Sequence, residues 1–177
     1  MTKKLTECSK CSLRGSKKVW GQVGLRGGIL FLGEAPGRNE IKEDEVFVGR
    51  AGKLLNKGLI SIGIDRESVT IINTILCNPP KNRDPSELEL ECCRKRVLHT
   101  IKKMRPKVII ILGKVPFYCL YGNKPKRDDR YRKMYWKKFR TIYVYHPAYF
   151  IYNHDEELFI RNFNMIRHAL DGENWRA

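Results

Sequence analysis

The chain has 177 residues, enough to bury a hydrophobic core of its own without disulfide or metal staples. Its 35 Lys and Arg residues against 19 Asp and Glu give a net charge of +16, which favours a polyanionic partner such as nucleic acid. Neither a secretory signal nor a stretch of membrane-spanning length is apparent, so we expect one intracellular domain over residues 1–177, cytoplasmic or associated with the nucleoid.

Four apolar runs rich in β-branched residues alternate with helical patterns along the chain. The runs are Ile29–Leu32, Val69–Ile75, Val108–Leu112 and Thr141–Val144, and the helical patterns are Ala51–Ile62, Glu87–Met104, Val115–Tyr121 and Asp155–Leu170. Ser86 and Glu89 form a capping-box pattern at the start of the second helix. Strands that alternate with helices predict an α/β fold in which helices cover both faces of a mostly parallel, four-stranded sheet.

Two of these apolar runs are followed at once by side chains suited to catalysis. The run Ile29–Leu32 is followed directly by Gly33 and Glu34, and then by Ala-Pro-Gly, which predicts a tight turn. Thr141–Val144 ends just before His146. In open parallel sheets, ligands bind in the crevice outside the carboxyl ends of the strands. We therefore expect Glu34 and His146 to lie in one active site.

The six cysteines of a chain expected to be intracellular are more typical of metal ligands or plain thiols than of disulfides. Cys8 and Cys11 form a C-x-x-C pair, Cys77 follows the second apolar run, and Cys92 and Cys93 are adjacent in a helix. At about 100° per residue, Cys93 falls on the core-facing stripe of that helix and Cys92 points nearly the opposite way. The residues thus predict a four-thiolate site of Cys8, Cys11, Cys77 and Cys93, for zinc or for an iron–sulfur cluster. The alternative is that the thiols pack as small apolar side chains and bind no metal.

Further motifs are spread in order over most of the chain. They are Cys8-x-x-Cys11, GEAPGRNE over Gly33–Glu40, FVGRAGKLL over Phe47–Leu55, Asn73, the loop Cys77–Pro85 that leads to Cys93, RPKVIIILG over Arg105–Gly113 and HPAYF over His146–Phe150. In this order they resemble the iron–sulfur (type 4) uracil-DNA glycosylases. The resemblance implies a [4Fe–4S] cluster on the four cysteines, a three-layer α/β/α fold and removal of uracil from DNA.

The resemblance also implies roles for individual side chains. Phe47 would stack on a uracil flipped out of the duplex, and Gly33 and Glu34 would complete its pocket. Asn73 would pair with N3–H and O4 of uracil, a pattern that cytosine does not offer. His146 would donate a hydrogen bond to O2 as negative charge builds on the departing base. The structural alternatives are core packing for Phe47 and a turn or cap for Asn73.

The group that activates the attacking water is left open between two carboxylates, Glu34 and Glu40. Ala35 stands at the position where the better-known uracil glycosylases carry Asp. Glu40 is the first choice, and the alternative for it is a solvated loop carboxylate. Either carboxylate would also stabilise the cationic sugar that bond cleavage leaves behind.

Basic and aromatic residues indicate where DNA is bound. Phe150, which follows the HPA motif, is expected to enter a base step as an apolar wedge. A polar insertion over residues 123–140 mixes Lys and Arg with aromatic residues, a composition that suits phosphate contact and base stacking. We expect Lys133, Lys137 and Lys138 of this insertion, together with Arg50, to contact DNA. The alternative is a solvated edge whose aromatic side chains pack into the core.

Other functions remain open from the sequence alone. One is a catalytically silent DNA-binding module, although Glu34, Phe47, Asn73 and His146 are all present, which counts against it. Another is a glycosylase for a modified uracil. A nucleotide-binding fold is not favoured, because the glycine run of residues 24–28 precedes its strand instead of following it. The expected partner is uracil-containing DNA, with no membrane, and the chain is expected to act as a monomer.

Overall fold

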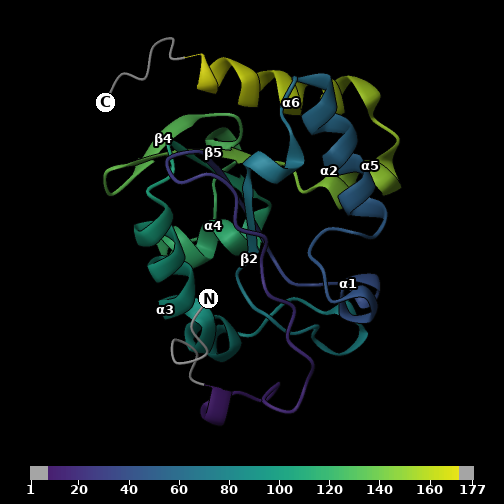
Figure 1. The fold of residues 1–177 in the computed structure, drawn as a ribbon, viewed down its shortest axis with the longest axis vertical. Coiled ribbons are helices and arrows are strands. Elements are labelled where there is room, and N and C mark those ends of the chain that lie inside the picture. The colour runs from purple at the N-terminus through teal and green to yellow at the C-terminus, as the bar shows by residue number, and fades with distance from the viewer. Residues whose placement is uncertain (1–7, 172–177) are drawn as a thin grey trace.

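A mostly parallel β-sheet forms the centre of the computed structural model, which describes residues 8–171 (Figure 1). Its strands are β1 (Ile29–Gly33), β2 (Thr70–Asn73), β3 (Val108–Leu112), β4 (Lys133–Trp136) and β5 (Phe139–Val144). Across this part of the chain they lie in the order β2-β1-β3-β5-β4. All neighbouring pairs are parallel except β4 and β5, which are antiparallel. The carboxyl ends of β1, β2, β3 and β5 therefore meet at one edge of the sheet.

Helices cover both faces of the sheet. They are α1 (Arg38–Glu43), α2 (Arg50–Ser61), α3 (Glu87–Met104), α4 (Lys114–Tyr121), α5 (Pro147–Asn153) and α6 (Glu156–Leu170). Leu55 of α2 and Phe163 of α6 pack with Phe31 of β1 on one face. Val97 of α3 and Phe117 of α4 pack on the other face, where they meet alternate strand residues such as Leu32. The predicted three-layer α/β/α fold is confirmed.

The helix start at Ser86 also follows the sequence pattern. The Glu89 N–H donates to the Ser86 hydroxyl at 3.3 Å, and the Ser86 N–H donates to the Glu89 carboxylate at 2.9 Å. The capping box predicted for α3 is therefore confirmed.

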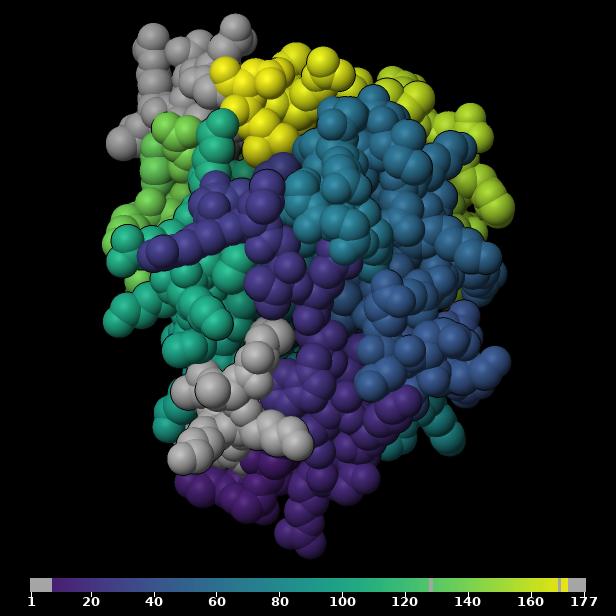
Figure 2. Space-filling model, viewed as in Figure 1, coloured from purple at the N-terminus to yellow at the C-terminus, as the bar shows by residue number. Residues whose placement is uncertain are grey.

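The segment before β1 runs along the outer edge of β2, where Gln22 forms an isolated antiparallel bridge with Ile71. In Figure 2 its purple and indigo residues run between the teal-green residues on one side and the blue residues of α1 and α2 on the other. Its first part joins a small separate cluster in which Leu13 packs with Leu76, Cys77, Leu90 and Cys93. This cluster connects Cys11 and Leu13 to the loop after β2 and to α3.

The prediction of four strands is wrong, because the polar insertion supplies a fifth. β4 pairs antiparallel with β5, and Trp136 at its end is buried against the α3–α4 face. The short helices α1 and α5 were not predicted either, since six and seven residues give too little periodicity to detect. Within residues 8–171, none of the helices is both long and apolar enough to cross a lipid bilayer.

The packing of α2 on α6 gives a test of the fold. A Cβ placed on Gly58 of α2 would overlap the ring of Phe163, so Gly58→Ala should lower the free energy of unfolding by about 1–3 kcal/mol. The gain in helix propensity from Gly to Ala is about 1 kcal/mol and should not offset the overlap. Gly15→Ala is the control, because a Cβ there meets nothing within 4 Å. Urea unfolding of the two variants measures the difference, and equal stabilities would contradict the close packing.

Candidate active site and thiol pocket

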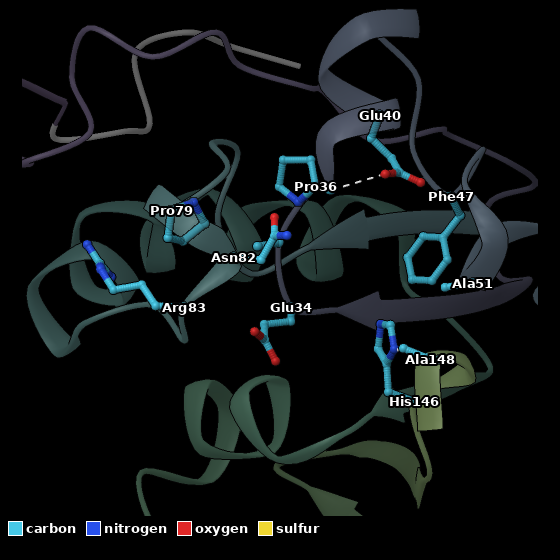
Figure 3. A pocket seen from close by; sticks show the side chains of 12 residues that line it. Glu34, Pro36, Glu40, Phe47, Ala51, Pro79, Asn82, Arg83, His146 and Ala148 are labelled. Atoms are coloured by element: carbon cyan, nitrogen blue, oxygen red, sulfur yellow. Dashed lines mark hydrogen bonds between the residues drawn. The ribbon is translucent and has the colours of Figure 1, made fainter. Parts of the chain in front are cut away.

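A cavity of about 230 Å³ opens where β1 and β5 end. Its walls come from the segment after β1, the loop before α2, the loop of residues 79–83 and the start of α5. Figure 3 shows Phe47 and His146 beside each other at one end, Arg83 at the other, and Glu34 between them. The volume lies below the range of about 300–1,000 Å³ that is usual for drug-sized ligands. The cavity therefore suits a single small ring.

His146 precedes α5 and presents a neutral hydrogen-bond donor. Its Nδ1 accepts the N–H of Ala148 at 3.1 Å, so in the neutral imidazole the proton resides on Nε2. Burial lowers the pKa of His146 to about 4, although the charge of Glu40 opposes the shift. The ring is thus uncharged at neutral pH and lines the cavity with one tautomer fixed.

Phe47 lies next to His146 in a constrained backbone conformation. The two ring centroids are 5.7 Å apart, with 34° between the ring planes. Phe47 has a φ of 53°, in the left-handed region that residues other than glycine rarely adopt. A Cβ on Gly52 would overlap the Phe47 carbonyl, so a glycine is needed where α2 crosses this turn. Such strain is concentrated at functional sites, and here it holds an aromatic ring over the cavity.

Gly33 and Asn73 are paired across β1 and β2 at the edge where the cavity lies. A Cβ on Gly33 would collide with both the Asn73 Oδ1 and the Phe47 ring, so only glycine lets that ring and that amide come together. Asn73 is 3% exposed and lies behind Gly33, outside the set of residues that line the cavity. Its Oδ1 has no hydrogen-bond partner in the described part of the chain. A buried acceptor left unpaired costs about 1–3 kcal/mol, and a ligand N–H would recover that cost.

Glu34 is poised to exchange a proton near neutral pH. Burial, and secondarily the charge of Asp84, raise the pKa of its carboxyl from 4.5 to about 7. Its carbonyl accepts hydrogen bonds from the Thr74 hydroxyl at 2.5 Å and from the Ile75 N–H at 3.2 Å, which fixes its backbone. No residue among 8–171 donates a hydrogen bond to its carboxyl group. Its oxygens are therefore available to water or ligand.

Glu40 is not the solvated loop carboxylate that the sequence left as its alternative. It is 9% exposed and accepts hydrogen bonds from the N–H groups of Gly37 at 3.1 Å, Val48 at 3.0 Å and Gly49 at 2.7 Å. These bonds tie α1 to the start of α2 and so hold the turn that carries Phe47. Most of the acceptor capacity of this carboxylate is used by the protein itself.

A second, smaller pocket gathers cysteine side chains between the amino-terminal segment, the loop after β2 and α3. Cys8, Cys11 and Cys93 lie close enough to Cys77 to interact electrostatically with it, as do Cys8 and Cys11 with Cys93. Cys92 is also buried and lines this pocket, so the prediction that it points away is wrong. The amino-terminal segment and the loop after β2 both cover this part of α3. Side chains on more than one face of the helix are therefore buried here, including both Cys92 and Cys93.

The thiols are of a type that binds metal ions, but their side chains are not positioned around a common point as metal ligands would be. Burial raises the pKa of Cys77 to about 11 and also raises that of Cys93, so both thiols are protonated when alone. A bound cation would supply the charge that deprotonates them. As the side chains lie, no group of three or more His, Cys, Asp or Glu residues within 8–171 forms a ready-made metal site.

One buried carboxylate connects the thiol pocket to the cavity. Glu89 accepts hydrogen bonds from the Ser12 hydroxyl at 2.6 Å and from both Arg83 terminal nitrogens, at 2.7 and 2.9 Å. Ser12 follows Cys11, and Arg83 lines the cavity. Arg83 was not predicted as a cavity residue. Its one signal was the turn-rich Pro-Pro-Lys-Asn-Arg-Asp-Pro loop that carries it.

Phe150, which the sequence predicts as a wedge, is buried in this structure. Phe150 is 6% exposed and makes edge-to-face contacts with Tyr145 and Phe159, at centroid distances of 6.1 and 5.4 Å. The short helix α5 turns this side chain inward, away from solvent. The exposed aromatic residue of the segment is Tyr152, at 73%.

The predicted DNA-binding cations fall into two groups. Lys137 and Lys138 form the turn between β4 and β5, at the amino end of β5 and thus at the sheet edge opposite His146. The structure does not bring these two lysines to the cavity. Lys133 pairs with Ile142 at the other end of β4, nearer the cavity edge. Arg50 is exposed at the first residue of α2, next to Ala51, which lines the cavity.

Comparison with known proteins identifies relatives over most of the chain. The family model of the uracil DNA glycosylase superfamily matches residues 20–171. A type-4 uracil-DNA glycosylase of Archaeoglobus fulgidus is 36% identical, over 86% of this chain and 82% of the relative. One from Saccharolobus solfataricus is 34% identical over 94% of this chain and 83% of the relative. One from Thermotoga maritima is 34% identical over 89% of this chain and 85% of the relative.

The Glu89 connection predicts a pH-dependent contribution to stability. Hydrogen bonds from Arg83 are the first cause that lowers the pKa of Glu89 from 4.5 to about 2. The stabilisation is therefore complete above pH 4.5 and is lost as pH falls toward 2. Glu89→Gln should cost about 1–3 kcal/mol at pH 7, toward the lower end because solvent screens the half-exposed Arg83.

Urea unfolding of Glu89→Gln and of the parent between pH 7 and pH 3 tests this connection. The two stabilities should converge as pH falls. Glu43→Gln, which alters a carboxylate paired only at the surface with Lys42, is the control and should change little at any pH. A Glu89→Gln deficit that stays constant down to pH 3 would contradict the assigned role of the carboxylate.

Proposed function

This chain belongs to the uracil DNA glycosylase superfamily and, within it, to the type-4 uracil-DNA glycosylases, and from that membership and the site we propose how it removes uracil from DNA. The reaction hydrolyses the N-glycosidic bond and leaves an abasic site. The observation that carries the proposal is a neutral His146 donor beside Phe47 at one end of a small cavity, with the unpartnered Asn73 oxygen close to the same ring at Gly33.

Base recognition is assigned to Phe47 and Asn73. The target nucleotide leaves the stack and its base enters the cavity, a step that duplex DNA opposes by a few kcal/mol. The Phe47 ring lies against Gly33 and would stack on the base. The Asn73 amide would accept N3–H at Oδ1 and donate to O4, whereas the N4 amine of cytosine would face a donor.

Departure of the base is assigned to His146. Negative charge builds on uracil as the bond to the sugar lengthens, and a fixed donor aimed at O2 stabilises that charge. A neutral imidazole suits this role because its tautomer is set by the Ala148 N–H before the base arrives. Charge stabilisation then requires no rearrangement in the transition state.

Water activation is assigned to Glu34 in preference to Glu40, which was the first choice from the sequence. A carboxyl group with a pKa of about 7 is ionised in about half of the molecules at neutral pH, and its ionised form still binds a proton well enough to take one from water. The Glu34 carboxyl has no donor among residues 8–171, whereas Glu40 already accepts three backbone N–H groups. Glu40 then orients the turn of Phe47, and the Glu34 carboxylate accepts a proton from the water that attacks the sugar.

The thiol pocket is proposed to hold a [4Fe–4S] cluster through Cys8, Cys11, Cys77 and Cys93. Support comes from these four thiols, which line one pocket together with Cys92, since clusters of this kind are held by four thiolates. The cluster would supply a structural tie. It would hold the amino-terminal segment and the loop after β2 near the Arg83 side of the cavity.

DNA contact is assigned to cations that flank the cavity. Arg50 and Lys53 are exposed on the first turn of α2, and Lys57 continues the same face one turn later. Residues three and four apart lie on one side of a helix, so these three can follow a strand that enters the cavity beside Ala51. We propose a monomer that acts on DNA within the cell, as the sequence predicts.

An oligonucleotide with one uracil tests the proposed function directly. After incubation with the protein, alkali should break the strand at the uracil position and leave control strands with cytosine or thymine intact. A protein that binds the oligonucleotide without alkali-sensitive breaks would instead be the silent DNA-binding module. Cleavage only at a modified uracil such as 5-hydroxymethyluracil would identify a different substrate.

The role of His146 predicts a loss in chemistry without an equal loss in binding. His146→Ala should lower the single-turnover rate on uracil DNA by about 100- to 1,000-fold, because the bond it makes strengthens as charge develops. DNA affinity, measured by fluorescence anisotropy, should change far less. His99→Ala removes an exposed histidine of α3 and is the control. An unchanged single-turnover rate would remove His146 from the mechanism.

The role of Glu34 predicts the pH profile. Its pKa of about 7 means that the carboxylate forms as pH rises from 6 to 8, and His146, with a pKa of about 4, stays neutral over the same interval. The single-turnover rate should therefore increase through about pH 7 and then level. Glu34→Gln should be slower by about 100-fold or more and should lose this inflection. A flat profile in the parent protein would contradict the assignment.

A further inference from the structure

Arg96 is a buried charge whose hydrogen bonds account for only part of its guanidinium group. It is 1% exposed, inside α3 between the helix and the sheet. Its Nη2 donates to the carbonyls of Asn73 at 2.5 Å and Thr74 at 3.2 Å. Its Nε and Nη1 are buried and have no hydrogen-bond partner among the described residues. Guanidinium stays charged in proteins, so this environment leaves a positive charge uncompensated.

The acidic groups that face Arg96 are thiols. In the described part of the chain no carboxylate forms an ion pair with it, and the ionisable side chains that interact with it are the thiols of Cys93 and Cys119. Cys93 lies one helical turn earlier on the same side of α3 and lines the thiol pocket. A neutral thiol cannot balance a buried guanidinium, but a thiolate can.

A metal centre would turn these thiols into the missing counter-charge. Four thiolates carry more negative charge than a zinc ion or an iron–sulfur cluster carries positive, so the assembled site is anionic. Burying a net negative charge of this kind costs free energy unless a cation lies beside it. The guanidinium beside Cys93 and the thiol pocket therefore complement each other in charge.

The other end of the guanidinium reaches the base-recognition residue. Its two hydrogen bonds fix the backbone where β2 ends, and Asn73 is the residue whose amide oxygen lies unpartnered beside Gly33 and Phe47. Thr74 in turn donates to the carbonyl of Glu34 at 2.5 Å. One buried side chain thus connects α3, which carries Cys93, to the backbone of Asn73 and, through Thr74, to Glu34 in the cavity wall.

We infer that Arg96 is the buried counter-ion of the thiolate centre and, through the Asn73 and Thr74 carbonyls, a positioning residue for uracil recognition. The inference rests on the proposed glycosylase function and on a metal centre in the thiol pocket. Its two parts depend on different properties of the side chain, charge at one end and directed hydrogen bonds at the other. Two substitutions separate them.

Arg96→Met removes the charge at similar volume, and Arg96→Lys keeps the charge but loses the planar, two-carbonyl geometry. Metal content of freshly purified protein, and the rate of iron or zinc release to a chelator, report the first part. Arg96→Met should hold metal about 10- to 100-fold less tightly, as is usual when a partner just outside the ligands is removed. Arg96→Lys should hold metal like the parent protein.

Inhibition of cleavage by free uracil reports the second part. Arg96→Lys should weaken this inhibition about 3- to 10-fold, the effect of one net hydrogen bond, despite full metal content. Lys95→Met is the matched control, because it removes the same charge from the adjacent, exposed position of α3 and should change neither measurement.

Unchanged metal retention in Arg96→Met would overturn the counter-ion role. If Arg96→Met fails to fold, Arg96→Lys still decides: loss of metal, or unchanged inhibition by uracil, contradicts the inference. A parent protein that cleaves uracil DNA but binds no metal would also overturn it and leave the glycosylase proposal standing. A parent protein that binds metal but does not cleave uracil would contradict the proposed function, and metal retention would still test the counter-ion.

Discussion

The candidate site depends on the parallel arrangement of β1, β2 and β5. Parallel strands end at the same edge of a sheet, so residues far apart in sequence are brought together without any long loop. Gly33 and Asn73 are paired in register across two of these ends, and His146 follows the third. The same geometry separates the hairpin turn at Lys137 and Lys138 from the cavity, because β4 runs the opposite way.

The site is prepared before substrate arrives, and its polar groups differ in how much the protein restrains them. Glu40 accepts three backbone N–H groups, and His146 is fixed as one neutral tautomer. The Glu34 carboxyl and the Asn73 Oδ1 are left without protein partners in the described part of the chain. The restrained groups fix the geometry of the cavity. The unpartnered groups are those to which a uracil base and a water molecule would donate hydrogen bonds. That division is the electrostatic preorganisation expected of a catalytic site.

Much of the fold was predictable because the buried parallel strands are almost wholly apolar. The start of α3 was predictable because Ser86 and Glu89 form a complete capping box. The positions of Glu34 and His146 followed from the same strand ends. Phe150 and Cys92 could not be oriented correctly, because the seven-residue α5 gives little periodicity and two segments bury the start of α3. The direction of β4, and hence the place of Lys137, required knowledge of its strand partner. The sequence gives one indication of the unusual position of Arg96: it lies three residues after Cys93, on the side of the predicted helix that faces the core.

The state of His146 links the fold to the chemistry, and it can be observed without substrate. Nitrogen-15 NMR of the histidine side chains between pH 5 and pH 8 reports both the charge of the ring and which nitrogen carries the proton. We expect a neutral imidazole with its proton on Nε2 throughout, since burial lowers the pKa of His146 to about 4 and the Ala148 N–H occupies Nδ1. A ring that titrates near the ordinary pKa of 6.5, or one that carries its proton on Nδ1, would contradict the mechanism proposed for this site.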